Sequence, residues 1–249
     1  MTGFHEMPDG RRIAFRLTQR DGDEHKAPAI VFLPGYMSDM AGSKASALFD
    51  WAQAQGRTCL LLDYSGCGES GGTFADGTLS RWRDEVVALI EAKLEGPVLL
   101  IGSSMGGWLM LLVALALGER TAGLVGIAAA PDFSDWGYDE AMKARLRAGE
   151  TVLEDNPYGP DPTPTHPGFW ADAQSHRLLG APIPIACPVT LLHGQADADV
   201  PWETSLRLAE RLASDNVLIQ LSKSGDHRLS RPEDIARLLA AVEAHLTAA

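Results

Sequence analysis

The chain has 249 residues, of which 45% are hydrophobic and 22% are charged, with 25 glycines and 15 prolines. This composition is typical of a folded globular protein and excludes a disordered or fibrous chain. The formal net charge is −12, so the average surface repels phosphate groups, and we expect neither nucleic acid nor an anionic lipid surface as a partner.

The cysteines and the first residues bear on the cellular compartment. Cys59, Cys67 and Cys187 form no closely spaced pair, and an odd number of cysteines argues against a disulfide framework. Residues 1–12 contain no apolar stretch that could serve as the core of a signal peptide. We therefore expect a reducing compartment and a cytoplasmic location, and we expect neither a cofactor nor a metal.

Apolar runs and helical periodicity alternate along most of the chain. In chain order, the predicted elements begin with a strand pair within 4–17, a strand at 29–33, a helix at 45–55, a strand at 58–62, a helix at 79–90, a strand at 98–101 and a helix at 108–117 ended by Gly118. They continue with a strand at 122–129 and, after residue 187, with strands at 189–192 and 217–221 and helices at 206–212 and 235–246. Ser230 and Glu233 have the spacing of a capping box ahead of the last helix. This alternation predicts an α/β fold with a mostly parallel central sheet and helices on both faces.

One uncharged segment, residues 96–118, is long enough to imitate a membrane span. Its middle contains Gly102, Gly106 and Gly107, which predict a turn between a strand and a helix. We therefore expect this segment to be buried core, and we expect no stable membrane insertion.

The composition changes between residues 131 and 187. This stretch holds eight of the 15 prolines together with six aromatic residues: Phe133, Trp136, Tyr138, Tyr158, Phe169 and Trp170. A polar linker would be rich in proline without the aromatic residues. We predict that residues 131–187 form an inserted lid, and that residues 1–130 and 188–249 form the α/β core.

The residues 102–106 match the pattern G-x-S-x-G between a predicted strand and a predicted helix. This setting is typical of a nucleophile elbow, in which small neighbours allow a strained turn to expose the hydroxyl of the central serine. The pattern therefore predicts Ser104 as a nucleophile. A glycine-rich turn that only packs a helix against a sheet would give the same five residues.

A serine nucleophile needs a base, and the base needs a carboxylate to orient it. His227 follows the last predicted strand and Asp197 follows the strand before it, so the chain order is Ser, Asp, His, as in α/β-hydrolases. We predict that His227 is the base and Asp197 the acid. Other candidates are Asp199 and Asp226 for the acid and His193 for the base, although His193 fits better as a packing residue beneath the loop of the acid.

An acyl-transfer reaction also needs backbone donors for the oxyanion. The residue after the nucleophile, Met105, supplies one N–H group at the start of a helix. The loop after the strand 29–33 reads Pro34-Gly35-Tyr36, and we predict that the N–H group of Tyr36 supplies the second. The ring of Tyr36 can line the pocket at the same time.

With these residues, the chain resembles the α/β-hydrolase-fold serine esterases over nearly its whole length. Within them it is similar to the mitochondrial palmitoyl-protein thioesterases, also described as acyl-glucuronide esterases, and their bacterial relatives. The motifs that carry this resemblance are residues 34–40, 63–66, 102–108, 193–202 and 226–228. The resemblance implies an α/β-hydrolase fold and the hydrolysis of acyl thioesters or carboxylic esters by Ser104, Asp197 and His227.

The aromatic residues of the predicted lid favour a substrate with an apolar acyl group. The lid carries a net charge of −5, which disfavours a strongly anionic substrate unless Arg177 or Arg228 points into the site. The alternatives are a general carboxylesterase, an acyl-glucuronide esterase, and a small-molecule-binding module without turnover. The sequence leaves open the physiological substrate, the preference for thioesters or oxyesters, and the oligomeric state.

Overall fold

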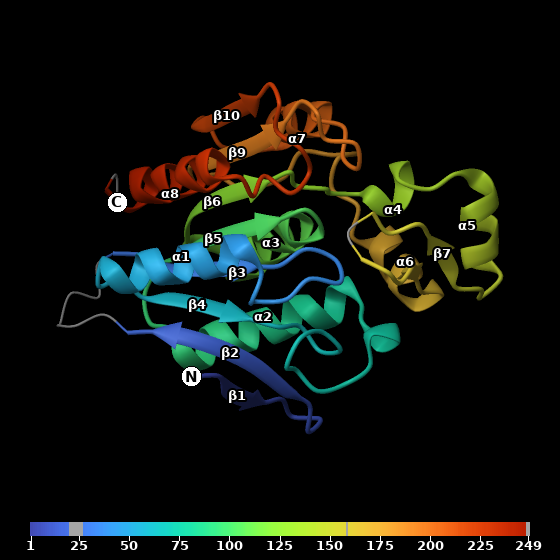
Figure 1. Cartoon of the computed structure of the whole chain (residues 1–249), viewed down its shortest axis with the longest axis horizontal. Helices are drawn as coiled ribbons and strands as arrows, with labels where there is room; N and C mark the ends of the chain where they lie inside the picture. The colour runs from blue at the N-terminus through green and yellow to red at the C-terminus, as the bar shows by residue number, and fades with distance from the viewer. Residues whose placement is uncertain (20–26, 158, 248–249) are drawn as a thin grey trace.

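The computed structural model describes residues 1–19, 27–157 and 159–247. Its centre is an eight-stranded sheet with the strand order β1-β2-β4-β3-β5-β6-β9-β10 (Figure 1). Strands β1 and β2 are antiparallel to their neighbours, and the remaining six strands run parallel to one another. The strands are β1 (Gly3–Glu6), β2 (Arg12–Thr18), β3 (Ala29–Leu33), β4 (Cys59–Leu62), β5 (Val98–Ser103), β6 (Thr121–Ile127), β9 (Val189–Gly194) and β10 (Val217–Ser222).

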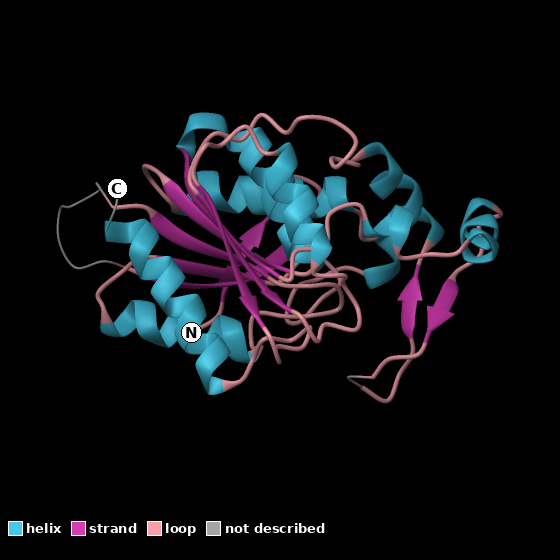
Figure 2. Cartoon of the chain, turned by 90° about the horizontal axis from the view of Figure 1, so that it is seen from above, coloured by secondary structure: helices cyan, strands magenta, loops and turns pink. Residues whose placement is uncertain are grey.

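Helices cover both faces of this sheet, as Figure 2 shows from above. Helices α1 (Ser43–Ala54) and α8 (Pro232–Thr247) pack on one face, where their apolar residues meet Ile30 and Phe32 of β3. Helices α2 (Leu79–Lys93), α3 (Met105–Leu117) and α7 (Glu203–Arg211) pack on the other face, where their apolar residues share one buried cluster with Val31 and Leu33. Successive side chains of a strand point to opposite faces, so a fully buried run such as β3 serves both layers at once.

The predicted core elements agree with the structure to within a few residues at their ends. The uncharged segment 96–118 forms the buried strand β5 and helix α3, and Gly118 follows α3 with a positive φ of 56°. Among the described residues, no helix has the length and apolar character needed to span a membrane.

The capping box predicted before the last helix is wrong. Helix α8 begins at Pro232, and the carbonyl of Arg231 accepts the first hydrogen bonds, from the amides of Asp234 and Ile235. Proline suits the first helical position because its missing N–H group would have no intrahelical partner there. Ser230 is one residue too early to cap, and its hydroxyl donates instead to the carbonyl of Arg228 at 2.9 Å.

The segment between β6 and β9 leaves the sheet and forms a separate layer beyond one end of it (Figure 1). It contains more regular structure than the sequence indicated: α4 (Phe133–Trp136), α5 (Glu140–Arg147), the antiparallel pair β7 (Val152–Glu154) and β8 (Thr163–Thr165), and α6 (Pro167–Ser175). Asp132 joins the start of this segment to a part near its end. Its carboxylate accepts hydrogen bonds from the amides of Leu178 and Leu179 at 2.7 and 2.8 Å.

Candidate active site

Ser104 lies on a sharp turn between β5 and α3. Its backbone has φ 55° and ψ −121°, a conformation that costs a non-glycine residue free energy and is typical of functional turns. The two flanking glycines make the turn possible. A Cβ atom on Gly102 would come within 2.3 Å of the Gly106 carbonyl oxygen, and one on Gly106 within 2.2 Å of the Leu33 carbonyl oxygen.

The structure brings the predicted base to the predicted nucleophile. His227 lies on the loop between β10 and α8, and its Nε2 atom is 3.1 Å from Oγ of Ser104. Its other ring nitrogen, Nδ1, is 2.9 Å from Oδ2 of Asp197. The three side chains therefore form one continuous hydrogen-bonded chain, with the distances that general-base catalysis needs.

Asp197 is held on both of its carboxylate oxygens. Oδ1 accepts hydrogen bonds from the amides of Asp199 and Val200 at 2.9 and 2.8 Å. Oδ2 faces Nδ1 of His227 and also Nε2 of His193, at 3.1 Å. Burial by itself would raise the pKa of this carboxyl, but the hydrogen bonds from His193 and His227 outweigh it and hold the pKa well below its usual range.

The rival candidates for the acid and the base have other contacts. The carboxylate of Asp226 accepts a hydrogen bond from the amide of Leu229 at 3.0 Å. Asp199 is exposed and contributes its own amide to Asp197. His193 lies beneath the loop of the acid, as its packing interpretation predicts, but it also contacts the carboxylate of Asp197, a contact that the sequence did not indicate.

The start of α3 and the loop after β3 border the nucleophile. Met105 is the first residue of α3, where an N–H group has no intrahelical acceptor. Gly35 lies against the nucleophile, because a Cβ atom on it would be 3.5 Å from Cβ of Ser104. The amide of Ser38 closes a turn onto the carbonyl of Gly35 at 3.1 Å, and Tyr36 inside this turn does not donate to that bond. Met105 and the loop that carries Gly35 and Tyr36 therefore both lie beside the nucleophile.

The ring of Tyr36 does not simply line the pocket. It is packed among Phe74, Trp82, Phe133 and Phe169, with ring centroids 4.9 to 6.2 Å away. Its hydroxyl donates to the carbonyl of Pro164 in β8 at 2.9 Å. Tyr36 thus connects the loop beside the nucleophile to the segment 131–187.

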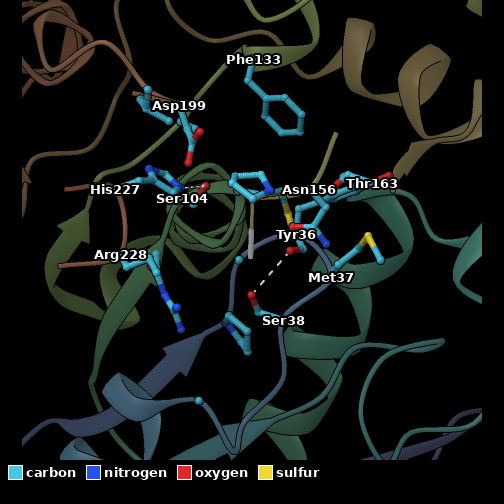
Figure 3. Close-up of a pocket in the computed structure, with 18 of the residues that line it drawn as sticks. Tyr36, Met37, Ser38, Ser104, Phe133, Asn156, Thr163, Asp199, His227 and Arg228 are labelled. Atoms are coloured by element: carbon cyan, nitrogen blue, oxygen red, sulfur yellow. Dashed lines mark hydrogen bonds between the residues drawn. The ribbon is translucent and has the colours of Figure 1, made fainter. Parts of the chain in front are cut away.

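A cavity of about 660 Å³ opens beside Ser104 and His227. One part of its wall is aromatic and comes from the segment 131–187, with Phe133, Trp136 and Tyr138. Another part carries Ser38, Lys44 and Arg228. Figure 3 shows Ser104 and His227 between Phe133 on one side and Ser38 and Arg228 on the other. The cavity thus offers an apolar wall and two basic side chains to one substrate, and its lining also includes the acidic residues Asp39, Glu154, Asp155 and Asp199.

The sequence did not indicate that Lys44 lines the cavity. Burial, and then the nearby charge of Arg228, lower the pKa of Lys44 to about 8. Its ammonium group donates to the carbonyl of Arg228. Lys44 directly precedes the helix predicted at 45–55 and lies in the first turn of α1 in the structure, and neither position gives a sequence signal for this contact. Arg177, the other arginine considered, pairs with Asp135 at 2.5 Å.

One group of side chains in the described part of the chain has ligand atoms close enough to hold a metal ion. The group consists of Asp197, Asp199 and His227, whose ligand atoms lie within 4.8 Å of one another. Asp197 and His227 are already hydrogen-bonded to each other. A cation at this position would therefore compete with the contact that orients His227 toward Ser104.

Residues 30–242 match the sequence model of the alpha/beta hydrolase family. The mitochondrial palmitoyl-protein thioesterase ABHD10 of Mus musculus is 41% identical over 224 residues, which cover 88% of this chain and 75% of the mouse protein. A putative hydrolase from Agrobacterium vitis S4 has a similar structure, with a TM-score of 0.91, 36% identity and 99% of both chains covered. The structure of mouse alpha/beta hydrolase domain-containing protein 10 gives a TM-score of 0.89 at 34% identity, covering 98% of this chain and 97% of the mouse chain.

Proposed function

This chain belongs to the alpha/beta hydrolase family, and we propose that it hydrolyses acyl thioesters or carboxylic esters through an acyl-enzyme on Ser104. The curated relatives are named palmitoyl-protein thioesterases, which favours a long acyl chain on the substrate. The observation that carries the assignment of residues is the chain of hydrogen bonds from Ser104 through His227 to Asp197.

In the first half of the proposed reaction, Ser104 Oγ attacks the acyl carbonyl carbon while Nε2 of His227 takes its proton. Asp197 holds the proton on Nδ1 of His227 and stabilises the imidazolium that forms. The amides of Met105 and Tyr36 donate to the oxyanion of the tetrahedral intermediate. His227 then returns the proton to the departing thiolate or alkoxide, which leaves Ser104 acylated.

In the second half, water replaces the leaving group. His227 takes a proton from the water as its oxygen attacks the acyl carbon, and the same two amides stabilise the second oxyanion. When the intermediate collapses, the proton returns to Ser104 Oγ and the carboxylic acid is released. This sequence consumes one water and needs neither a cofactor nor a metal.

Phe133, Trp136 and Tyr138 form an aromatic wall of the cavity, which favours the binding of an apolar acyl group on that side. All three residues belong to the segment 131–187. We therefore keep the proposal that this segment is a lid whose inner side selects the acyl group.

A second candidate substrate has support from the opposite wall. Lys44 and Arg228 both line the cavity, so an ester with an anionic leaving group, such as an acyl glucuronide, would find two cationic partners there. The acidic residues Asp39, Glu154, Asp155 and Asp199 also line the cavity and act against the binding of an anion.

Covalent labelling with a fluorophosphonate probe tests the proposed function. We expect the probe to modify Ser104 in the folded wild-type protein and not in the Ser104→Ala variant. Hydrolysis of matched thioesters and oxyesters of increasing acyl length then measures the preference for the acyl group. Folded protein that neither reacts with the probe nor hydrolyses any of these esters would point to a binding module without turnover.

For the compartment, we propose the cytoplasm. The three cysteines are free and two of them are buried, which is consistent with a reducing environment. The curated relatives carry "mitochondrial" in their names, so fractionation of cells that express the full-length protein is the direct test.

A further inference from the structure

His193 is a second histidine on the carboxylate of Asp197, and the proposed reaction does not use it. It lies near the end of β9, and both its side chain and that of Asp197 have a relative exposure of 0%. Its Nε2 atom is 3.1 Å from Oδ2 of Asp197 and 3.1 Å from the carbonyl oxygen of Val200. Its Nδ1 atom is 2.7 Å from the hydroxyl of Ser205 in α7.

These contacts fix where the ring proton of His193 resides. Nε2 faces two groups that can only accept, the ionised carboxylate of Asp197 and the carbonyl of Val200, so Nε2 must carry a hydrogen. Nδ1 faces a hydroxyl, which can donate to it. The neutral Nε2–H tautomer, with Ser205 donating to Nδ1, therefore satisfies every polar atom of the ring without a second buried positive charge beside His227.

We infer that His193, held by Ser205, is a positioning residue for the acid: it donates from Nε2 to Asp197 and fixes the carboxylate in the orientation that His227 needs. This inference rests on the proposed function, because it assigns His193 a role in the proposed Ser104–His227–Asp197 chain. His193 touches neither the nucleophile nor the substrate cavity, and it acts only through Asp197.

The hydrogen bonds of Asp197 show what His193 adds. The two amides on Oδ1 come from residues 199 and 200, in the same loop as Asp197, so they move with the carboxylate. His193 is instead part of the sheet, where β9 pairs with β6 on one side and β10 on the other. Its bond to Oδ2 ties the loop of the acid to a strand inside the central sheet.

The surroundings of His193 bear on any pH measurement. It contributes to the wall of a second cavity of about 260 Å³, which is also lined by Lys44, Asp234 and Arg237. Asp234 forms ion pairs with Arg231 and Arg237 at 2.8 Å. Together with Asp197 and His227, these charged groups surround His193.

Three variants separate positioning from packing. His193→Leu removes the donor but keeps an apolar side chain, His193→Gln keeps an N–H donor near the position of Nε2, and Ser205→Ala frees Nδ1 and so unlocks the tautomer. For His193→Leu we expect kcat to fall by about 10- to 100-fold with little change in KM, since a displaced catalytic group costs about this much. We expect His193→Gln to recover most of the loss and Ser205→Ala to lose less than His193→Leu.

The pH profile distinguishes the two roles further. Without the donor from His193, the carboxylate of Asp197 interacts more strongly with the imidazolium of His227. The acidic limb of the kcat/KM profile should then move to higher pH by about 0.5 unit in His193→Leu, and less in His193→Gln. A packing role alone would lower activity equally at all pH values. If His193→Gln loses as much as His193→Leu and neither profile moves, the inference is wrong.

A turnover-independent signal separates this inference from the proposed function. The proton between Nδ1 of His227 and Asp197 gives a downfield ¹H NMR resonance, and we expect it to shift in His193→Leu and Ser205→Ala. An unchanged resonance in both folded variants overturns the inference even if the wild type is active. A shifted resonance supports it even if no ester is hydrolysed. If His193→Leu fails to fold, as judged by thermal unfolding, Ser205→Ala decides the outcome.

Discussion

The Nε2 atom of His227 lies 3.1 Å from Oγ of Ser104, although 123 residues separate the two in the sequence. Ser104 follows β5 and His227 follows β10, and two further parallel strands, β6 and β9, lie between them in the sheet. All of these strands present their carboxyl ends at the same edge, where loops from distant parts of the chain converge. The contact is therefore a consequence of sheet topology.

Asp197→Asn tests the assignment of the acid. An asparagine amide in place of the carboxylate favours the wrong tautomer of His227, and we expect kcat to fall by about 10⁴-fold, as when the acid of such a triad is replaced by its amide. Asp199→Asn is the matched control, because it removes an exposed charge two residues away. It should change kcat/KM by less than about tenfold. Equal losses in the two variants would contradict the assignment of Asp197.

Lys44 gives a pH dependence that depends on the substrate. Its pKa is lowered to about 8, first by burial and then by Arg228, so Lys44 is charged below that pH and neutral above it. We expect the ratio of kcat/KM for an ester with an anionic leaving group to that for a neutral ester to decrease as the pH rises through about 8. The ratio measured from pH 6 to 10 checks this.

Lys44→Met and Lys44→Arg serve as the controls for that experiment. Lys44→Met removes the charge at every pH, so its ratio should be low and flat. Lys44→Arg keeps a charge throughout the range, since an arginine stays protonated, and its ratio should remain high above pH 8. A wild-type ratio that does not change with pH would mean that Lys44 does not contact the leaving group.

The strands and helices of the core could be predicted from the sequence because each of them has a local sequence pattern. The buried run 29–33 and the periodic apolar residues of 79–90 predicted β3 and α2, and the glycines at 102 and 106 predicted the turn at Ser104. The structure supplies the reason for these glycines, since any side chain at 102 or 106 would overlap a backbone carbonyl. The capping box failed because Pro232 begins α8 and places Ser230 outside the helix.

The contacts that the sequence did not reveal depend on how loops fold in three dimensions. The sequence did not indicate the hydrogen bond between His193 and Asp197, because this bond forms only when the loop after β9 turns back toward the strand. Lys44 reaches Arg228 across 184 residues. The short elements of the segment 131–187 were missed because pieces of three or four residues, such as β7 and β8, are too short to show a period.

Tyr36→Phe tests the connection between the loop beside the nucleophile and the segment 131–187. The substitution keeps the packed ring and removes only the hydrogen bond to Pro164, so we expect a loss of about 1 kcal/mol in the free energy of unfolding. If this bond also places the amide of Tyr36, kcat should fall severalfold while KM for short esters stays constant. Thermal unfolding and steady-state kinetics measure the two effects.

The Tyr36→Ala variant is the comparison for Tyr36→Phe. It also removes the ring from its four aromatic neighbours, and we expect it to destabilise the protein by about 3–5 kcal/mol. Tyr36→Phe with wild-type stability and wild-type kcat would show that the hydroxyl is dispensable for both fold and reaction.

A second serine also lies beside a histidine and an aspartate. Ser80 Oγ is 2.6 Å from Oδ1 of Asp172 and 2.7 Å from Nε2 of His176, and its amide donates to Oδ2 of Asp172 at 3.0 Å. Here the carboxylate of α6 caps the N-terminus of α2 and accepts the hydroxyl proton directly, so the hydroxyl is not activated by the histidine. Trp108 Nε1 adds a bond to the carbonyl of His176 at 3.0 Å.

We therefore expect Ser80 to fasten α6 to α2 and to take no part in catalysis. Ser80→Ala should lower the free energy of unfolding by about 1–2 kcal/mol, because it leaves Asp172 and His176 without a partner hydroxyl. Thermal unfolding measures this loss, and the fluorophosphonate probe tests the chemistry. The probe should label Ser80→Ala as it labels the wild type, at Ser104. Covalent labelling that persists in Ser104→Ala and disappears in the Ser80→Ala, Ser104→Ala double variant would identify Ser80 as a second nucleophile and contradict a purely structural role.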